Sequence, residues 1–201
     1  RSLVLAFLAV IALGPVVQPW YLLWVLPLAA ATGLSSRELR VVLLLVAGFV
    51  TSGVVRGILV GITVLIVSLF FAHISIHNVA IIALFLLLTS TALALAGLIN
   101  GVYAKTFDGI SIVPTFVLAP LIYLGGVFYS VDVLPPFWQQ VTHFNPLFYV
   151  IDGFRYGFLG TSDVSVGLSL AVLLALNTVF AGLAWYFIRT GLGLRQQRPK
   201  A

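Results

Sequence analysis

Three kinds of residue are missing or scarce in this chain of 201 residues. It has no cysteine, which excludes disulfides, thiolate nucleophiles and cysteine-ligated metals. It also has no methionine, even at position 1, so we expect a fragment or a processed form. Charged residues make up 7% of the sequence, whereas soluble domains have about 25%. This scarcity of charge excludes an ordinary soluble domain.

Apolar residues dominate instead. They make up 62% of the chain, and the mean hydropathy is +1.20. Several charge-free windows exceed the ~18 residues that a membrane-spanning helix needs. The ten basic residues give a net charge of +5, but they gather at the ends of apolar runs and form no basic stripe. The composition therefore predicts an all-α polytopic membrane protein with the lipid bilayer around it and no nucleic-acid partner.

The alternation of apolar runs and polar breaks predicts a single transmembrane domain, residues 1–201. The apolar segment 1–34 contains prolines and is either a broken hairpin or one span with a re-entrant piece. We expect four clear spans after residue 40. The predicted segments are three spans within 41–129 (41–71, 79–103 and 110–129), external helices in 130–165, a last span at 166–188 and a tail at 189–201.

The basic residues predict the orientation of these spans. Cytoplasmic loops carry an excess of Lys and Arg, and the tail contains Arg189, Arg195, Arg198 and Lys200. A cytoplasmic C-terminus places segment 130–165 outside the cell. Counting back along the chain then puts Lys105 and the 35–40 segment inside, so every basic cluster falls on the cytoplasmic side.

Small residues recur at the four-residue spacing that lets helices approach closely in a membrane. Gly53, Gly57 and Gly61 form one such series, and Gly97 with Gly101 forms another in the following span. Either ordinary packing within the chain or a contact between two copies explains this spacing.

Arg56 lies within the apolar run 41–71, with Ser52 and Thr63 on the same side of the helix. An arginine at membrane depth must be paired or hydrated, which suggests an internal polar contact near a substrate pathway. If the true span is 52–71, however, Arg56 lies near the cytoplasmic end and only extends its side chain to the membrane surface.

Two short helices are predicted in the external segment. The first, Leu134 to Phe144, begins at two prolines and is amphipathic, which suits a helix on the outer membrane surface with Trp138 at headgroup level. The second runs from Asn145, a capping residue followed by Pro146, to Gly160. Along it, Asp152 and Arg155 are three residues apart and could form an ion pair.

No catalytic or cofactor site emerges from these patterns. His73 and His77 are four apart but lack a third metal ligand, and Asp132, His143 and Asp152 match no known mechanism. A GxxxxGK[ST] nucleotide loop is absent, so any ATP must be bound by another chain. We expect no catalytic residue, no metal and no cofactor bound by this chain.

Several motifs in one order resemble a known family. They are the GGxFY stretch at Gly125 and Gly126, LPPFW at 134–138, the NP step at 145–146, GFRYGFLG at 153–160 and, earlier, AGFVTSGVVRGILVG at 47–61. Together they resemble the permease subunits of type-2 ABC (ABC-2) exporters, and most of all the YadH-like inner-membrane transport permeases of bacteria. The resemblance covers residues 47–195.

The resemblance implies a six-span fold in the bacterial inner membrane, with cytoplasmic termini and two external re-entrant helices. It also implies a homodimer bound to two separate ATPase subunits, which use ATP and magnesium to export an amphipathic, lipid-linked or drug-like substrate. The external helices would form a gate. The gate residues implied are Gly125, Gly126, Leu134, Pro135, Trp138, Asn145, Pro146, Asp152 and Arg155.

This chain departs from the family at its front. Relatives have an amphipathic leading helix and a charged segment that touches the ATPase, and here only Arg37, Glu38 and Arg40 stand in that place. A non-transporting membrane scaffold, or a truncated and inactive permease fragment, is therefore the alternative function. A third hypothesis, an intramembrane enzyme acting on lipids, lacks the paired acid and base that it needs.

Overall fold

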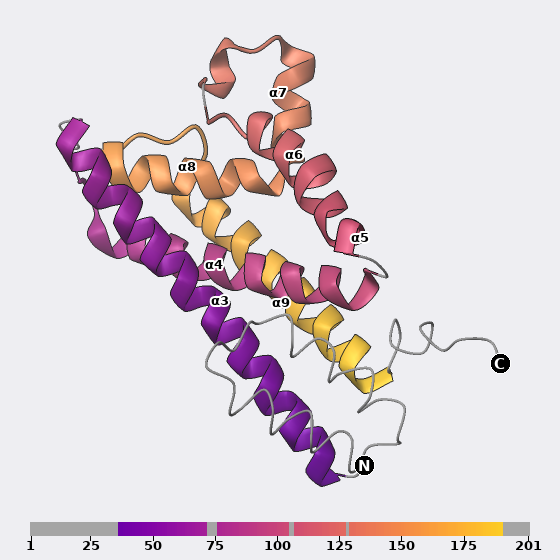
Figure 1. Cartoon of the computed structure of the whole chain (residues 1–201). Coiled ribbons are helices and arrows are strands. Elements are labelled where there is room, and N and C mark those ends of the chain that lie inside the picture. The colour runs from indigo at the N-terminus through magenta and orange to yellow at the C-terminus, as the bar shows by residue number, and fades with distance from the viewer. Residues whose placement is uncertain (1–35, 72–75, 105–106, 128, 191–201) are drawn as a thin grey trace.

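The computed structural model describes residues 36–71, 76–104, 107–127 and 129–190. These residues form helices and connecting turns, with no strand among them (Figure 1). The elements are α3 (Ser36–Phe71), α4 (Val79–Tyr103), α5 (Phe107–Ile112), a π-helical segment η1 (Val113–Leu118), α6 (Ala119–Tyr123), a 3-10 turn η2 (Val131–Val133), α7 (Pro136–His143), α8 (Pro146–Leu159) and α9 (Val166–Thr190). The predicted all-helical class is confirmed for this part of the chain.

Three helices in the described ranges are long and apolar enough to cross a membrane: Val46–Phe71, Val79–Tyr103 and Val166–Phe187. They match three of the spans predicted after residue 40. Helix α3 is continuous over 36 residues, about 54 Å at 1.5 Å per residue, which exceeds a hydrocarbon core of ~30 Å. The described helix includes residues 36–40, so this polar segment is helical and not a break before the helix.

The span predicted at 110–129 is shorter in the structure. Its apolar helix covers Gly109–Tyr123 and ends before the two glycines. Pro114 and Pro120 lie inside it and lack the N–H that an α-helix needs. The helix therefore widens into a π-helical turn, in which the N–H of Ala119 donates to the carbonyl of Pro114, five residues earlier.

The glycine series of α3 lies against α4. A Cβ added at Gly53 would come within 2.9 Å of the Ala94 side chain, and one at Gly61 within 2.8 Å of Leu86. Between them, Gly57 faces Ser90. The close approach of α3 and α4 within one chain accounts for the four-residue spacing, the first of the two explanations left open by the sequence.

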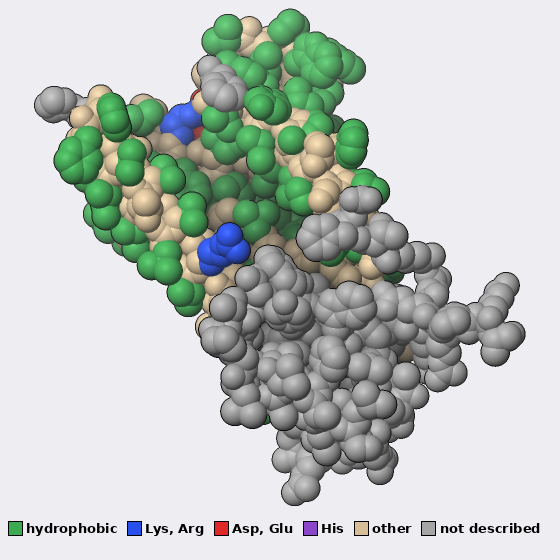
Figure 2. Space-filling view, viewed as in Figure 1, with side chains coloured by type: hydrophobic (Ala, Val, Ile, Leu, Met, Phe, Trp, Pro, Cys, Tyr) green, Lys and Arg blue, Asp and Glu red, His purple; other side chains and the backbone are tan. Residues whose placement is uncertain are grey.

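Helix α4 lies at the centre of the packing. One buried cluster joins its Leu95 and Leu98 to Ala184 of α9, and a second joins its Phe85 to Val150 of α8 and Leu173 of α9. Helix α8 crosses near the upper ends of the long helices, α5 and α6 stand beside them, and α7 lies at the top of the view (Figure 1). The described part of the face in Figure 2 is largely apolar, as expected where lipid is the solvent.

Candidate functional site

The candidate site is centred on α8, whose ends are defined by its own sequence. The side chain of Asn145 accepts a hydrogen bond from the N–H of Leu147 at 3.0 Å, and Pro146 is the first helical residue. At the other end Gly160 has φ 75°, the left-handed conformation that favours glycine at a helix C-terminus. The helix therefore occupies the predicted range.

Helix α8 packs closely on the first half of α4 through glycines. A side chain at Gly153 would overlap the ring of Phe85, which is completely buried. The carbonyl of Gly157 accepts hydrogen bonds from the N–H groups of His77 at 3.1 Å and Asn78 at 2.9 Å. Sequence reasoning did not single out Gly157, although Gly153, Gly157 and Gly160 have a spacing close to that of the α3 series.

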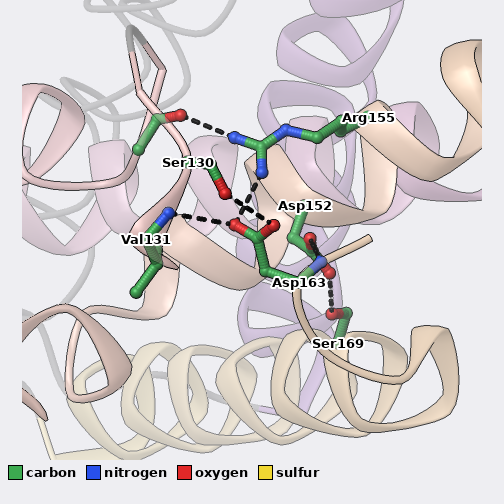
Figure 3. A network of polar contacts seen from close by, with 7 residues as sticks. Ser130, Val131, Asp152, Arg155, Asp163 and Ser169 are labelled. Atoms are coloured by element: carbon green, nitrogen blue, oxygen red, sulfur yellow. Dashed lines mark hydrogen bonds and ion pairs between the residues drawn. The ribbon is translucent and has the colours of Figure 1, made fainter. Parts of the chain in front are cut away.

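Asp152 is buried at the junction of α8 with α9. It has 0% exposure, and its two oxygens accept hydrogen bonds from the N–H of Asp163 at 2.7 Å and from the hydroxyl of Ser169 at 3.4 Å (Figure 3). Burial raises the pKa of Asp152 above its ordinary value, and the Asp163 N–H bond opposes this only in part.

The ion pair expected between Asp152 and Arg155 is replaced by another one. Arg155 Nη1 lies 2.7 Å from Asp163 Oδ2, and Arg155 Nη2 donates to the carbonyl of Gly126 at 2.7 Å. Asp152 lies in the junction with α9, where its oxygens accept from the Asp163 N–H and the Ser169 hydroxyl. The loop after Gly160 meanwhile turns back and brings the Asp163 carboxylate to the guanidinium (Figure 3).

Asp163 also holds the turn that precedes α7. Its carboxylate accepts hydrogen bonds from the hydroxyl of Ser130 at 3.1 Å and the N–H of Val131 at 3.3 Å. Burial alone would raise the pKa of Asp163, but the bonds from Arg155 and Val131 outweigh it and hold the pKa below its ordinary value. Sequence reasoning missed Asp163, because this residue lies in a loop without periodicity.

The turn after α6 completes the site. Gly126 has φ 81°, and it presents its carbonyl to Arg155. A Cβ at Gly125 would come within 2.6 Å of Ile151 on α8. The side-chain amide of Asn145 donates to the carbonyl of Leu121 at 2.6 Å, so one residue caps α8 and ties it to α6.

Helix α7 exposes aromatic side chains. It begins at Pro136, two residues later than predicted, with Pro135 before it and the carbonyl of Leu134 accepting from Gln139 at 2.8 Å. Phe137 is 67% exposed and Trp138 45%. Such an amphipathic surface is typical of a helix that lies at a membrane boundary.

The other predicted site residues lie apart from this network. Arg56, Ser52 and Thr63 are exposed on α3, where the two hydroxyls donate to carbonyls of their own helix, at Phe49 and Leu59. Gly97 has no atom within 4 Å of an added Cβ, and Gly101 is half-buried. For Arg37, Glu38 and Arg40 the helical backbone is described but the side chains are not; His73, Phe128, segment 1–34 and the tail beyond Thr190 lie outside the described residues.

The hydrogen bonds and the ion pair of this arrangement hold segments of the fold together. Both carboxylates are engaged by donors, and no group of three or more His, Cys, Asp or Glu residues that could hold a metal occurs in the described ranges. What the network does is join three separate segments: the turn after α6, helix α8 and the start of α9.

Comparison with known proteins identifies relatives. The ABC-2 type transporter family matches residues 38–159. An inner membrane transport permease of Escherichia coli (strain K12), YadH, is 54% identical over 151 residues, which cover 75% of this chain and 59% of the relative. The YadH permease of Shigella flexneri gives the same values.

More distant relatives carry another name. Nodulation protein J of Rhizobium leguminosarum bv. viciae is 34% identical over 86 residues, or 43% of this chain and 33% of the relative. The matched stretch spans 59% of the length of the YadH permeases, so the chain covers less than two thirds of those relatives. No solved structure matches the chain significantly.

Proposed function

The chain belongs to the ABC-2 type transporter family, and from that membership we propose that it is the transmembrane permease subunit of an ABC exporter in the bacterial inner membrane. The observation that carries the proposal is the match over residues 38–159, which includes α3, α4 and the whole of α8. Its relatives include proteins named as inner membrane transport permeases.

The substrate we propose is amphipathic, lipid-linked or drug-like, and it moves outward. A separate ATPase subunit supplies the energy from ATP and magnesium, and two copies of the permease form the pathway. The cytoplasmic C-terminus inferred from the basic tail supports this direction, because it puts α7 and α8 on the outer side.

In this proposal α7, α8 and the glycine turn form the external gate. The turn is attached to α8 by two polar contacts, Arg155 to Gly126 and Asn145 to Leu121, and by one apolar contact, Gly125 to Ile151. Helix α8 itself packs on α4 and α9. The glycine turn is thus held by a few directional contacts, whereas α8 is packed tightly. Such a turn can move relative to α8, as a gate that opens and closes requires.

Co-purification tests the partner. The full reading frame is expressed with a candidate ABC ATPase from the same genome, and an affinity tag on the permease should recover the ATPase. Reconstituted vesicles should then export an amphipathic probe in a vanadate-sensitive manner. A matched preparation in which the catalytic glutamate of the ATPase is replaced should bind but not export. Failure of every candidate ATPase to associate would overturn the proposal.

A further inference from the structure

The register between α3 and α4 places Arg56 level with the middle of α4, a helix long and apolar enough to span a membrane. Gly53 lies against Ala94 and Gly57 against Ser90, so Arg56 is level with Thr91. That residue is the midpoint of the 25-residue helix Val79–Tyr103, about 18 Å from either end at 1.5 Å per residue. This depth argues against the explanation in which Arg56 merely extends to the membrane surface.

No acidic residue of the sequence has its described backbone at that level of the helices. The 201 residues contain five acidic ones, so the search covers the whole sequence. Glu38 precedes Arg56 by 18 residues on the same helix, about 27 Å. The others are Asp108, at the start of α5 beyond the far end of α4, and Asp132, Asp152 and Asp163 in the external region.

Asp152 comes nearest in depth, but its carboxylate already accepts hydrogen bonds from other groups. Its neighbour Gly153 packs on Phe85, six residues from Thr91 and so about 9 Å farther out. Both oxygens of Asp152 accept hydrogen bonds from other groups. No ion pair or hydrogen bond joins Arg56 to another described residue, and the hydroxyls of Ser52 and Thr63 donate to carbonyls of their own helix.

We propose that Arg56 is a binding site for the anionic group of the transported molecule, so that the substrate class is an anionic amphiphile. This inference rests on the proposed transport function. An unpaired guanidinium within the bilayer is costly, and a phosphate or carboxylate on the substrate offsets that cost with charge-assisted hydrogen bonds. The hydroxyl oxygens of Ser52 and Thr63, on the same side of α3, add polar surface.

Two other sources of negative charge fit the depth less well. A second copy related by a two-fold axis along the membrane normal has its carboxylates at the same depths as the first, so it also brings none to Arg56. Headgroups of bulk lipid lie about 18 Å away along the helix axis, at the ends of α4. We therefore infer that a ligand drawn into the membrane interior is the occupant.

Binding of defined probes to the purified full-length protein tests the site. The protein is placed in phosphatidylcholine nanodiscs and titrated with dodecyl phosphate, and with dodecyltrimethylammonium as the cationic match. Wild type should bind dodecyl phosphate at least about tenfold more tightly than Arg56→Gln, because one charge-assisted interaction is lost. Arg56→Lys should bind with intermediate affinity, and the cationic probe should not distinguish wild type from Arg56→Gln.

The controls separate the possible failures. Arg189→Gln removes an exposed arginine near the end of α9 and should leave binding unchanged. Thermal denaturation without probe shows whether Arg56→Gln is folded; if it is not, the comparison of Arg56→Lys with wild type decides. Equal binding by wild type and a folded Arg56 variant would overturn the proposal. Displacement of the probe by phosphatidylglycerol in the nanodisc would also overturn it, because the anion bound to Arg56 would then be a bulk lipid headgroup.

This readout needs neither an ATPase nor export. If binding fails while an ATPase co-purifies, the anionic-substrate inference falls and the permease function stands. If binding succeeds while no ATPase associates, the site stands and the permease function falls.

Discussion

Asp152 and Asp163 lie in contact, yet their pKa values move in opposite directions from the ordinary value of 3.8. Asp152 has a raised pKa because it is buried, so its protonation favours the folded state, and this contribution is lost as pH rises through the raised pKa. Asp163 has a lowered pKa, so its contribution is present above pH 3.8 and is lost as pH falls toward the lowered pKa. On acidification the two effects partly cancel.

Asp152→Asn should therefore make the protein more sensitive to acid. The asparagine keeps an acceptor for the Asp163 N–H and a donor for Ser169, so the fold is retained while one titrating group disappears. As the pH falls through the raised pKa of Asp152 toward 3.8, the Tm of wild type should gain relative to that of this variant. Below pH 3.8, Asp163→Asn should show a shallower fall in Tm than wild type. Parallel pH profiles for all three proteins would contradict this account.

Arg155 should not be replaceable by lysine. Its planar guanidinium donates to Asp163 and to the Gly126 carbonyl at once, each at 2.7 Å, with side-chain exposures of 18% for Arg155 and 14% for Asp163. A lysine ammonium cannot span both acceptors in this geometry. We expect Arg155→Lys to destabilise the protein by about 1.5 kcal/mol, measured by thermal denaturation. Arg189→Lys, at the exposed end of α9, should have no effect, and equal Tm values for the two variants would refute the prediction.

The close packing of α8 on α4 requires a glycine at position 153. A methyl group at Gly153 would overlap the buried ring of Phe85, so Gly153→Ala should cost about 1–3 kcal/mol of stability. Gly97→Ala is the matched control, because nothing lies within 4 Å of a Cβ there, and it should be neutral or slightly stabilising. The double variant Gly153→Ala with Phe85→Leu should recover part of the loss in Tm. No recovery would mean that the overlap is not the cause.

The side chain of Asn145 makes two separate hydrogen bonds at the start of α8. Its carbonyl oxygen caps α8, and its amide nitrogen holds the carbonyl of Leu121 on α6. Asn145→Ser keeps a capping oxygen but removes the amide, so hydrogen exchange should accelerate in α6 and stay slow in α8. Asn145→Ala should accelerate both, since a lost cap costs about 1 kcal/mol. Equal exchange in the serine and alanine variants would show that the two tasks are not independent.

At the scale of the whole molecule, the absence of cysteine makes the orientation directly testable. Ser162 is exposed in the loop between α8 and α9. Ser162→Cys should react with a membrane-impermeant maleimide in intact spheroplasts, because this loop lies outside in the proposed orientation. Gln197→Cys, in the basic tail, should react only after permeabilisation. The reverse pattern would invert the topology.

The sequence by itself determined the helices. In hydrocarbon every backbone polar group must be satisfied within its own segment, so a charge-free run such as 79–103 can only be a helix. Local chemistry also determined α8, from the Asn145 cap to Gly160, because caps depend on neighbouring residues alone. The predicted helix at 110–129 was too long, because it ends at Tyr123, ahead of the two glycines and the left-handed turn at Gly126.

Only the tertiary structure decided which residues meet. Arg155 pairs with Asp163 and not with Asp152, because a loop without periodicity folds back over α8. The glycines of α3 face α4, and that register places Arg56 level with the middle of α4. Such contacts depend on how helices far apart in sequence are aligned, and a pattern along one helix carries no information about its alignment with the next.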